Sequence, residues 1–270
     1  MATPIGNLED ITLRAIRILK DVQLIAAEDT RRTRKLLNAY DIHTPLMSLY
    51  EQVEEKKSSR LISRLHKGMN VAYVSDAGTP GISDPGYVLV DQAIAHGIKV
   101  VPVPGVSAVI AALSVSGLPV EPFIFYGFLP SRSASRKIFL QSVADEIKTL
   151  VLYESPKRLI ATLYDIESVL GDRRIVVMRE LTKVFEEILR GTVSSVMGTL
   201  QEKTVKGEIT IIIAGKKQTP PSYSDNDIRA RLEQLRSHTD LSRRDIIEKL
   251  AHDMGIPRKT VYKIVINHEG

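Results

Sequence analysis

The loop at residues 75–86 is rich in residue types that form ligand sites, with three Gly, two Pro and two Asp. It follows the apolar residues 71–74 and precedes an amphipathic stretch. A strand-to-helix connection needs only about two to six residues, so this loop is longer than the connection requires. Glycine allows close approach to the backbone, and open α/β sheets bind ligands at the carboxyl ends of their strands. We interpret the loop as one wall of a binding site; the alternative is a rigid surface turn.

A second loop of this kind, residues 102–108, follows the apolar residues 98–101 and leads into a stretch of small residues. The two loops are expected to form adjacent walls of one pocket. The alternative for the second loop is that its small residues only allow a helix to pack tightly on the sheet. Both interpretations can hold together. Neither loop matches G-x-G-x-x-G or G-x-x-x-x-G-K-[ST], so the sequence does not support a dinucleotide or a triphosphate. A third glycine-containing loop, residues 2–8, is expected on composition alone to be a frayed terminus.

Charged residues gather where the apolar residues 24–27 end. Glu28 and Asp29 come first, and a basic turn follows with Arg31, Arg32 and Arg34. One interpretation is a carboxylate at a cleft beside a turn that binds phosphate. The alternative is a solvated helix face with Asp29 as its N-cap. Glu154 also stands at a strand end without a capping role, so Glu28 and Glu154 are our candidate catalytic carboxylates.

Composition excludes several kinds of site. Cysteine is absent, which excludes disulfides and Cys-ligated zinc and is typical of a reducing cytoplasm. The six histidines show no metal-ligand spacing, so we expect no metal. No apolar run approaches the ~20 residues of a membrane span, and no signal peptide is visible. The net charge of +5 favours a polyanionic partner, whereas an aromatic content of 5% without Trp is poor material for base stacking.

The elements that must position these residues alternate between strand and helix in the first half. Apolar runs predict strands at 24–27, 71–74 and 98–101, and amphipathic spacing predicts helices at 11–19, 30–40, 51–66 and 87–96. Gly68 and Gly97 stand where helices end. Strand–helix–strand order of this kind indicates a parallel sheet covered by helices.

The order is less regular in the second half, after a turn-rich stretch at 117–122. Strands are predicted at 123–126, 150–153, 175–178 and 209–213, with helices at 135–147, 155–169 and 193–200. Ser155 is the expected N-cap and Pro156 the first residue of the middle helix. The charged stretch at 180–187 is expected to be solvated. This order indicates a mixed sheet.

The chain ends in a linker at 216–221 and three predicted helices within 224–269. Ser224 with Asp227, and Ser242 with Asp245, fit the S-x-x-D capping pattern. A short turn at Gly255 before a basic helix is similar to a helix-turn-helix; the alternative is a plain helical unit for dimerisation. We therefore divide the chain into an N-terminal α/β lobe at 1–116, a second α/β lobe at 117–215, and a linker with helical extension at 216–270.

Several of these stretches, taken together in order and spacing, resemble one family. They are residues 2–11 (ATPIGNLEDI), 27–31 (AEDTR), 75–86, 104–108 (PGVSA), 153–158 (YESPKR), 180–191 and 207–210. The sequence is identified by them as a member of the ribosomal RNA small subunit methyltransferase I family, within the tetrapyrrole methylase superfamily. The resemblance covers residues 2–215, and the tail is similar to the family's C-terminal extension.

The resemblance implies a two-lobed tetrapyrrole-methylase-like fold with S-adenosylmethionine in the cleft. It also implies methylation of the ribose 2′-hydroxyl of a cytidine in the decoding region of 16S rRNA, and a homodimer. The implied donor-binding residues are Pro4, Asp76, Ala77, Gly78, Thr79, Ile82, Ser107, Ala108 and Leu181. Arg31, Arg32 and Arg34 would then bind rRNA phosphates. The candidates for the base are Glu28, Asp29, Asp76, Asp84, Glu154 and Lys183, of which we favour Glu28 and Glu154. A sulfonium donor carries its own leaving group, so no metal is required.

One departure from the resembled family concerns the start of the chain. The family has an apolar strand immediately before the loop at 2–8, and Met1 and Ala2 leave no room for it. We expect the pocket wall at Pro4 to lack that anchor. Two alternatives stay open: methylation of a tetrapyrrole or another small molecule, and an RNA-binding protein that uses a degenerate methylase fold without catalysis.

Overall fold

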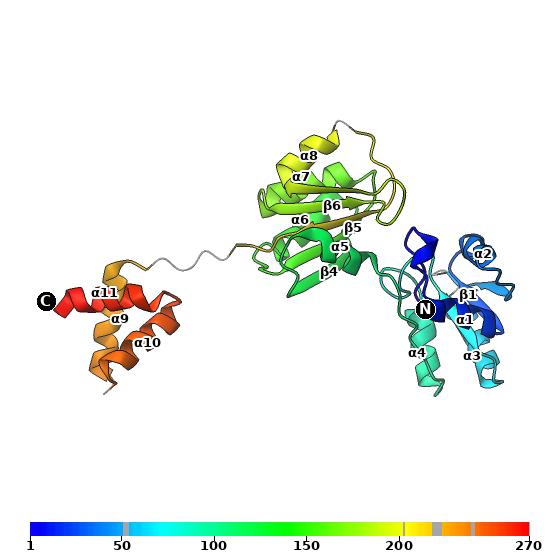
Figure 1. Cartoon of the computed structure of the whole chain (residues 1–270), viewed down its shortest axis with the longest axis horizontal. Helices are drawn as coiled ribbons and strands as arrows, with labels where there is room; N and C mark the ends of the chain where they lie inside the picture. Colours follow the sequence, from blue (N-terminus) through cyan, green and yellow to red (C-terminus); the bar gives the residue numbers. More distant parts are fainter. Residues whose placement is uncertain (51–53, 202, 218–222, 239–240, 270) are drawn as a thin grey trace. The chain divides into compact units, whose positions relative to one another are not determined.

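The computed structural model describes residues 1–50, 54–201, 203–217, 223–238 and 241–269. Residue contacts divide the chain into two compact units, 1–216 and 217–270 (Figure 1). The first unit contains two sheets, one in each of two lobes, and the second is helical. Within the described ranges, no helix is long and apolar enough to cross a membrane.

The first lobe has a parallel three-stranded sheet in the order β2-β1-β3. Along the chain its elements are the short 3₁₀ helix η1 (Leu8–Asp10), α1 (Leu13–Asp21), β1 (Leu24–Ala27), α2 (Thr30–Ala39), β2 (Leu46–Ser48), α3 (Glu54–His66), β3 (Val71–Val74) and α4 (Tyr87–Ala95). The predicted helix at 51–66 includes residues 51–53, which lie outside the described residues. The parallel sheet is confirmed, while β2 went unpredicted because three half-buried residues carry almost no periodic signal.

The central strand β1 is buried on both faces, which explains its uninterrupted apolar sequence. Ile25 and Ala27 face a core built with α1 and α2. Leu24 and Ala26 face the opposite core, built with α3 and α4. Figure 1 shows these two helix pairs around the sheet. The C-terminal end of β1, where Glu28 follows, is therefore fixed from both sides.

The predicted strand at 98–101 is wrong. Those residues have no ladder partner, because the sheet of the described residues ends at β3. Val100 and Val101 are 44% and 52% exposed, so the apolar run is not buried as a central strand would be. An apolar sequence favours a strand only where a neighbour offers paired backbone groups.

The expected frayed terminus at 2–8 is also wrong. The Thr3 amide donates to the Gly78 carbonyl at 2.9 Å, and the Gly78 amide donates back to Thr3 at 3.0 Å. The Ala2 amide donates to the Val103 carbonyl at 3.0 Å, and Ala2 and Thr3 are both 4% exposed. Backbone bonds on two sides thus hold the segment that leads to Pro4.

The second lobe has a mixed five-stranded sheet in the order β4-β5-β8-β6-β7, in which only β4 and β5 are parallel. Its elements are α5 (Ala108–Ser116), β4 (Phe123–Phe128), α6 (Ser133–Ser142), β5 (Thr149–Glu154), α7 (Leu159–Leu170), β6 (Arg174–Arg179), β7 (Glu187–Thr192), α8 (Val193–Gln201) and β8 (Ile209–Ile213). One face packs on α6, α7 and α8 and the other on α5. The mixed sheet is confirmed, and β7 was missed because its edge sequence EILRGT lacks a buried run.

The start of α7 differs from the prediction. The helix begins at Leu159 with Arg158 as N-cap, so neither Ser155 nor Pro156 has its expected role. The Ser155 amide donates instead to a carboxylate oxygen of Glu154 at 2.6 Å, and a short turn follows. This later start places Arg158 and Thr162 beside Glu154.

The helical unit contains α9 (Asp225–His238), α10 (Arg243–Met254) and α11 (Arg258–Glu269) around its own apolar core. The predicted caps are confirmed: the Asp227 amide donates to the Ser224 hydroxyl at 3.2 Å and the Asp245 amide to Ser242 at 3.3 Å. Gly255 ends α10 in the left-handed region at φ 61°. The predicted linker residues 218–221 lie outside the described residues.

Candidate active site

A cavity of about 380 Å³ lies between the two lobes of the first unit. Its walls come from the loop after β3, the start of α5, and the ends of β4, β5 and β8. This volume lies at the lower end of the range of small-molecule sites, about 300–1,000 Å³. The cavity is therefore large enough for a nucleoside-sized ligand.

Most of the predicted site residues line this one cavity. They are Glu28, Arg32, Asp76, Ala77, Gly78, Thr79, Ile82, Ser107, Ala108, Glu154 and Leu181. Pro4 is not among the lining residues; its neighbour Ile5 is, and a Cβ added to Gly78 would lie 3.4 Å from the Ile5 side chain. The two loops predicted as adjacent walls of one pocket do meet here.

Glycines give the loop after β3 its path. Gly78 and Gly86 have φ angles of 73° and 131°, in the region that other residues rarely adopt. A Cβ on Gly86 would lie 2.5 Å from the Tyr73 ring, so the chain passes too close to β3 for a side chain there. The backbone conformation therefore requires glycine at positions 78 and 86.

A short segment near the start of the chain contacts both lobes. The Asn7 amide donates to the Thr182 hydroxyl at 3.1 Å, across the cleft from the Thr3–Gly78 pair. A Cβ on Gly6 would lie 2.4 Å from the Lys183 side chain. Residues 3–7 consequently bridge the loop after β3 and the loop that carries Leu181.

Two carboxylates of the first lobe are bonded at the edge of the cavity. The Asp76 amide donates to Glu28 at 3.3 Å, and the Asp29 amide donates to Asp76 at 2.9 Å. Arg32 forms an ion pair with Asp76 at 3.3 Å. Burial raises the pKa of Glu28, and the carboxylates of Asp76 and Asp29 add to the effect.

Asp84 is the most perturbed carboxylate of the cavity. Burial, followed by the charge of Glu28, raises the pKa of Asp84 from 3.8 to about 6, although the Ser75 hydroxyl bonds to it. Asp76 and Glu208 act in the same direction. At neutral pH the group is mostly ionised yet basic enough to accept a proton. Our sequence-based selection counted Asp84 among the candidate bases but favoured Glu28 and Glu154 over it.

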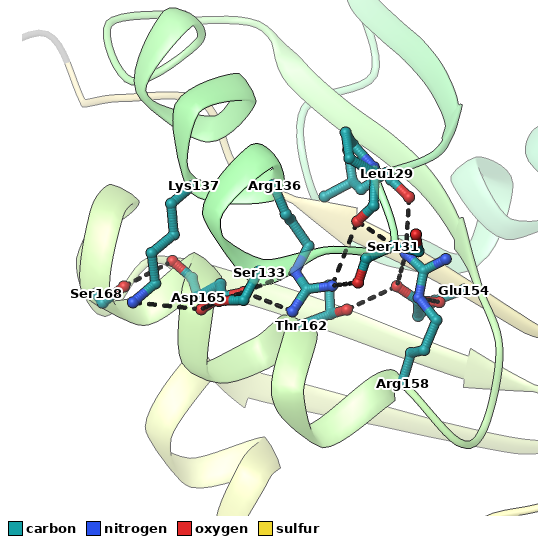
Figure 2. Close-up of polar contacts among 11 residues, drawn as sticks. Leu129, Ser131, Ser133, Arg136, Lys137, Glu154, Arg158, Thr162, Asp165 and Ser168 are labelled. Carbon is teal, nitrogen blue, oxygen red and sulfur yellow. Dashed lines mark hydrogen bonds and ion pairs between the residues drawn. The ribbon is translucent and has the colours of Figure 1, made fainter.

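Glu154 is buried in the cavity wall and its carboxylate oxygens already have partners. It accepts from the Thr162 hydroxyl at 2.6 Å and from Arg158 Nη2 at 3.2 Å (Figure 2). It also accepts from the Ser155 amide. Its side chain is only 1% exposed. This geometry favours a positioning role over proton transfer.

The three arginines of α2 do not share one site. Arg32 lines the cavity through its contact with Asp76. Arg31 and Arg34 line a separate surface hollow with Thr30, Lys35 and Asn38. Arg31 also pairs with Asp29 at 3.0 Å and lowers the pKa of that carboxyl to about 2. Asp29 is the N-cap of α2, so the predicted capping role is confirmed. The basic hollow lies on the same helix.

Sequence reasoning missed four side chains of the second lobe that line the cavity: Phe128, Tyr153, Glu208 and Thr210. Phe128 and Tyr153 are register partners at the ends of the parallel pair β4 and β5. The signal was their position at two strand ends, the same criterion that selected Glu154. Among the described residues, no group of three His, Asp or Glu side chains could hold a metal.

Two lobes with a cleft at the strand ends and a glycine-rich loop are the architecture of an α/β methylase of the tetrapyrrole type, the class to which the chain belongs. The family model described as Tetrapyrrole (Corrin/Porphyrin) Methylases matches residues 2–197. The solved structure of the cobalamin biosynthetic enzyme cobalt precorrin-4 methyltransferase is similar with a TM-score of 0.59. It is 18% identical and covers 77% of this chain and 90% of its own, so it supports the fold.

Within that class, the chain belongs to the ribosomal RNA small subunit methyltransferase I family. It is 45% identical to the family member from Halalkalibacterium halodurans, over 98% of this chain and 92% of that protein. It is 44% identical to the member from Synechocystis sp., over 100% of this chain and 97% of that protein.

Proposed function

We propose that this protein transfers a methyl group from S-adenosylmethionine to the ribose 2′-hydroxyl of a cytidine in 16S rRNA. The observation that carries the proposal is the single cavity in which the loop after β3, the start of α5 and acidic residues converge. Membership of the ribosomal RNA small subunit methyltransferase I family supports the substrate.

The residues present fit the donor. Ile5, Ile82 and Leu181 supply apolar walls for an adenosyl group, and Ser107 with the first residue of α5 lies beside them. Amides at a helix start have no partner within the helix and can bond polar atoms of a ligand. Gly78, at positive φ, brings backbone to the same wall. When bound, the donor supplies an electrophilic methyl group on a sulfonium that leaves as a neutral thioether.

The chain's own residues have two tasks, alignment and proton removal. Holding the acceptor oxygen in line with the methyl group removes much of the entropic barrier. A positioned base accelerates such a step by about 10²–10⁴-fold. Asp84 is the proposed base, because it lines the cavity and burial, followed by the charge of Glu28, raises its pKa. Glu28 and Glu154 line the same cavity.

The basic hollow on α2 supports an RNA acceptor. Arg31, Arg34 and Lys35 surround a depression of about 320 Å³ on the surface. Clustered cations of this kind bind phosphate groups through charge-assisted hydrogen bonds. We assign this hollow to the rRNA backbone, and Arg32 to the cavity itself.

The test is transfer of tritium from labelled S-adenosylmethionine to small ribosomal subunits that lack the modification. Label in 16S rRNA that survives alkaline hydrolysis as a cytidine-containing dinucleotide supports 2′-O-methylation of that base. A corrinoid precursor serves as the second acceptor. Label in the precursor alone, or donor binding without any transfer, would contradict the proposal.

A further inference from the structure

Two aromatic rings of the second lobe line the cavity together with the expected donor residues. Phe128 ends β4 and Tyr153 is its register partner on β5. Their ring centroids are 5.7 Å apart with planes at 57°, and Phe125 packs edge-on against Tyr153 at 4.9 Å. Phe128 is nonetheless 56% exposed and lines the cavity. The Phe128 ring therefore contacts Tyr153 on one side and remains exposed to the cavity on the other.

The backbone that follows Phe128 is anchored by two arginines. Arg158 donates to the Leu129 carbonyl at 2.7 Å, and Arg136 donates to the Ser131 carbonyl at 3.2 Å (Figure 2). Each cation is balanced by a buried carboxylate, Glu154 for Arg158 and Asp165 for Arg136. Buried charges of this kind are costly unless they are paired and bonded, as they are here. These contacts hold in place the backbone that follows Phe128.

Two carboxylates act on the hydroxyl end of Tyr153, and one of them, Glu208, also accepts from Lys183 Nζ at 3.1 Å. Asp84 and Glu208 line the same cavity, and burial together with these two charges raises the pKa of Tyr153 to about 12. Ionised carboxylates accept from the exocyclic amino group of cytosine, whereas uracil presents a carbonyl oxygen at that position. The surroundings of the rings therefore suit a base that carries an amino group.

We infer that Phe128 and Tyr153 form a stacking platform for the acceptor cytosine, held in position by the Arg158–Glu154 and Arg136–Asp165 pairs. This inference rests on the proposed function. A buried ribose hydroxyl within a folded RNA is reached by extruding its nucleotide, and aromatic side chains commonly receive the extruded base. The low aromatic content predicted poor material for stacking, but a single base needs only the two rings that the fold brings together.

The test compares F128L with F128Y, and with F123L as a matched control at the opposite end of β4. Phe123 is 37% exposed and does not line the cavity. Loss of base–aromatic stacking is expected to lower kcat/KM for small subunits by about 5- to 100-fold in F128L. F128Y and F123L should stay close to wild type, and all three should bind S-adenosylmethionine with unchanged Kd.

A substrate that lacks the base gives a second, independent measurement. Small subunits reconstituted with an abasic acceptor nucleotide retain the 2′-hydroxyl but have nothing to stack. The kcat/KM of wild-type enzyme should fall on this substrate by about the same factor as F128L loses on normal subunits. F128L should have the same kcat/KM as wild type on the abasic substrate, since coupled changes are not additive.

The outcomes separate the two proposals. Wild-type enzyme without any transfer to normal subunits contradicts the proposed function. Active wild-type enzyme with F128L equal to F123L, or with full kcat/KM on the abasic substrate, overturns the platform alone. If F128L folds poorly, which its donor Kd and melting temperature reveal, the abasic substrate with wild-type enzyme decides.

Discussion

Replacing Asp84 with Asn should stabilise the protein at alkaline pH while it removes activity. The folded-state pKa of Asp84 is raised from 3.8 to about 6, so ionisation above pH 6 weakens the folded state. A shift of about two pH units corresponds to ~3 kcal/mol, and because the group is only half-buried, solvent screening reduces this to about 1 kcal/mol. The destabilisation is absent below about pH 4 and complete above about pH 7.

The assay is thermal unfolding of D84N and wild type at pH 4.5, 6 and 8. A gain of about 1 kcal/mol in a unit of this size raises Tm by about 2–4 °C at pH 8, and the gain should shrink toward pH 4.5. D91N, an exposed change of the same charge on α4, is the control and should not show this trend. At pH 8, kcat/KM of D84N should fall by about 10²–10⁴-fold if Asp84 is the base.

Three results would refute this reasoning in different ways. A D84N variant that is less stable at pH 8 contradicts the destabilising burial of the charge. A gain of the same size at all three pH values contradicts its electrostatic origin. Wild-type activity that does not decline as the pH falls below about 6 contradicts the assignment of Asp84 as proton acceptor.

The remaining predictions concern the wall, the basic hollow and the glycine loop. E154A should cost about 1–3 kcal/mol in chemical denaturation because it leaves the half-buried Arg158 and the buried Thr162 hydroxyl without their carboxylate partner, and E154Q should cost less; equal costs would contradict this. R31A combined with R34A should reduce the log–log salt slope of small-subunit binding by about 1–2 without changing donor Kd, whereas R17A on α1 should leave the slope unchanged. G86A should destabilise the protein by about 1–3 kcal/mol and weaken donor binding, because its Cβ collides with an aromatic ring and its φ is 131°; unchanged Kd and Tm would contradict the strain argument.

The sequence contained enough information to predict most of the first unit. The apolar residues of β1 and the glycines after the helices have one structural interpretation each, and both are confirmed. The failure at 98–101 has a physical cause, because a strand needs a neighbour and hydrophobicity cannot show whether one exists. β7 was missed for the opposite reason, since its ladder with β6 forms without an apolar run.

The site could be predicted only as far as strand ends could be recognised. That criterion located Glu28 and the loop after β3, and Glu28 and seven residues of the loop line the cavity. It could not show that the Glu154 carboxylate is already hydrogen-bonded to Arg158 and Thr162, because these contacts depend on α7 beginning at Leu159. Nor could it pair Phe128 with Tyr153, since the register of β4 on β5 follows from packing of the whole lobe.

The amide–hydroxyl bond from Asn7 to Thr182 bears on how the two lobes are kept in register beside the cavity. Such a bond contributes only about 0.5–1.5 kcal/mol, and the close approach of Gly6 to Lys183 adds packing at the same contact. Residues 3–7 therefore tie the loop after β3 to the second lobe, so a larger side chain at position 6 would change the spacing between the two walls of the cavity.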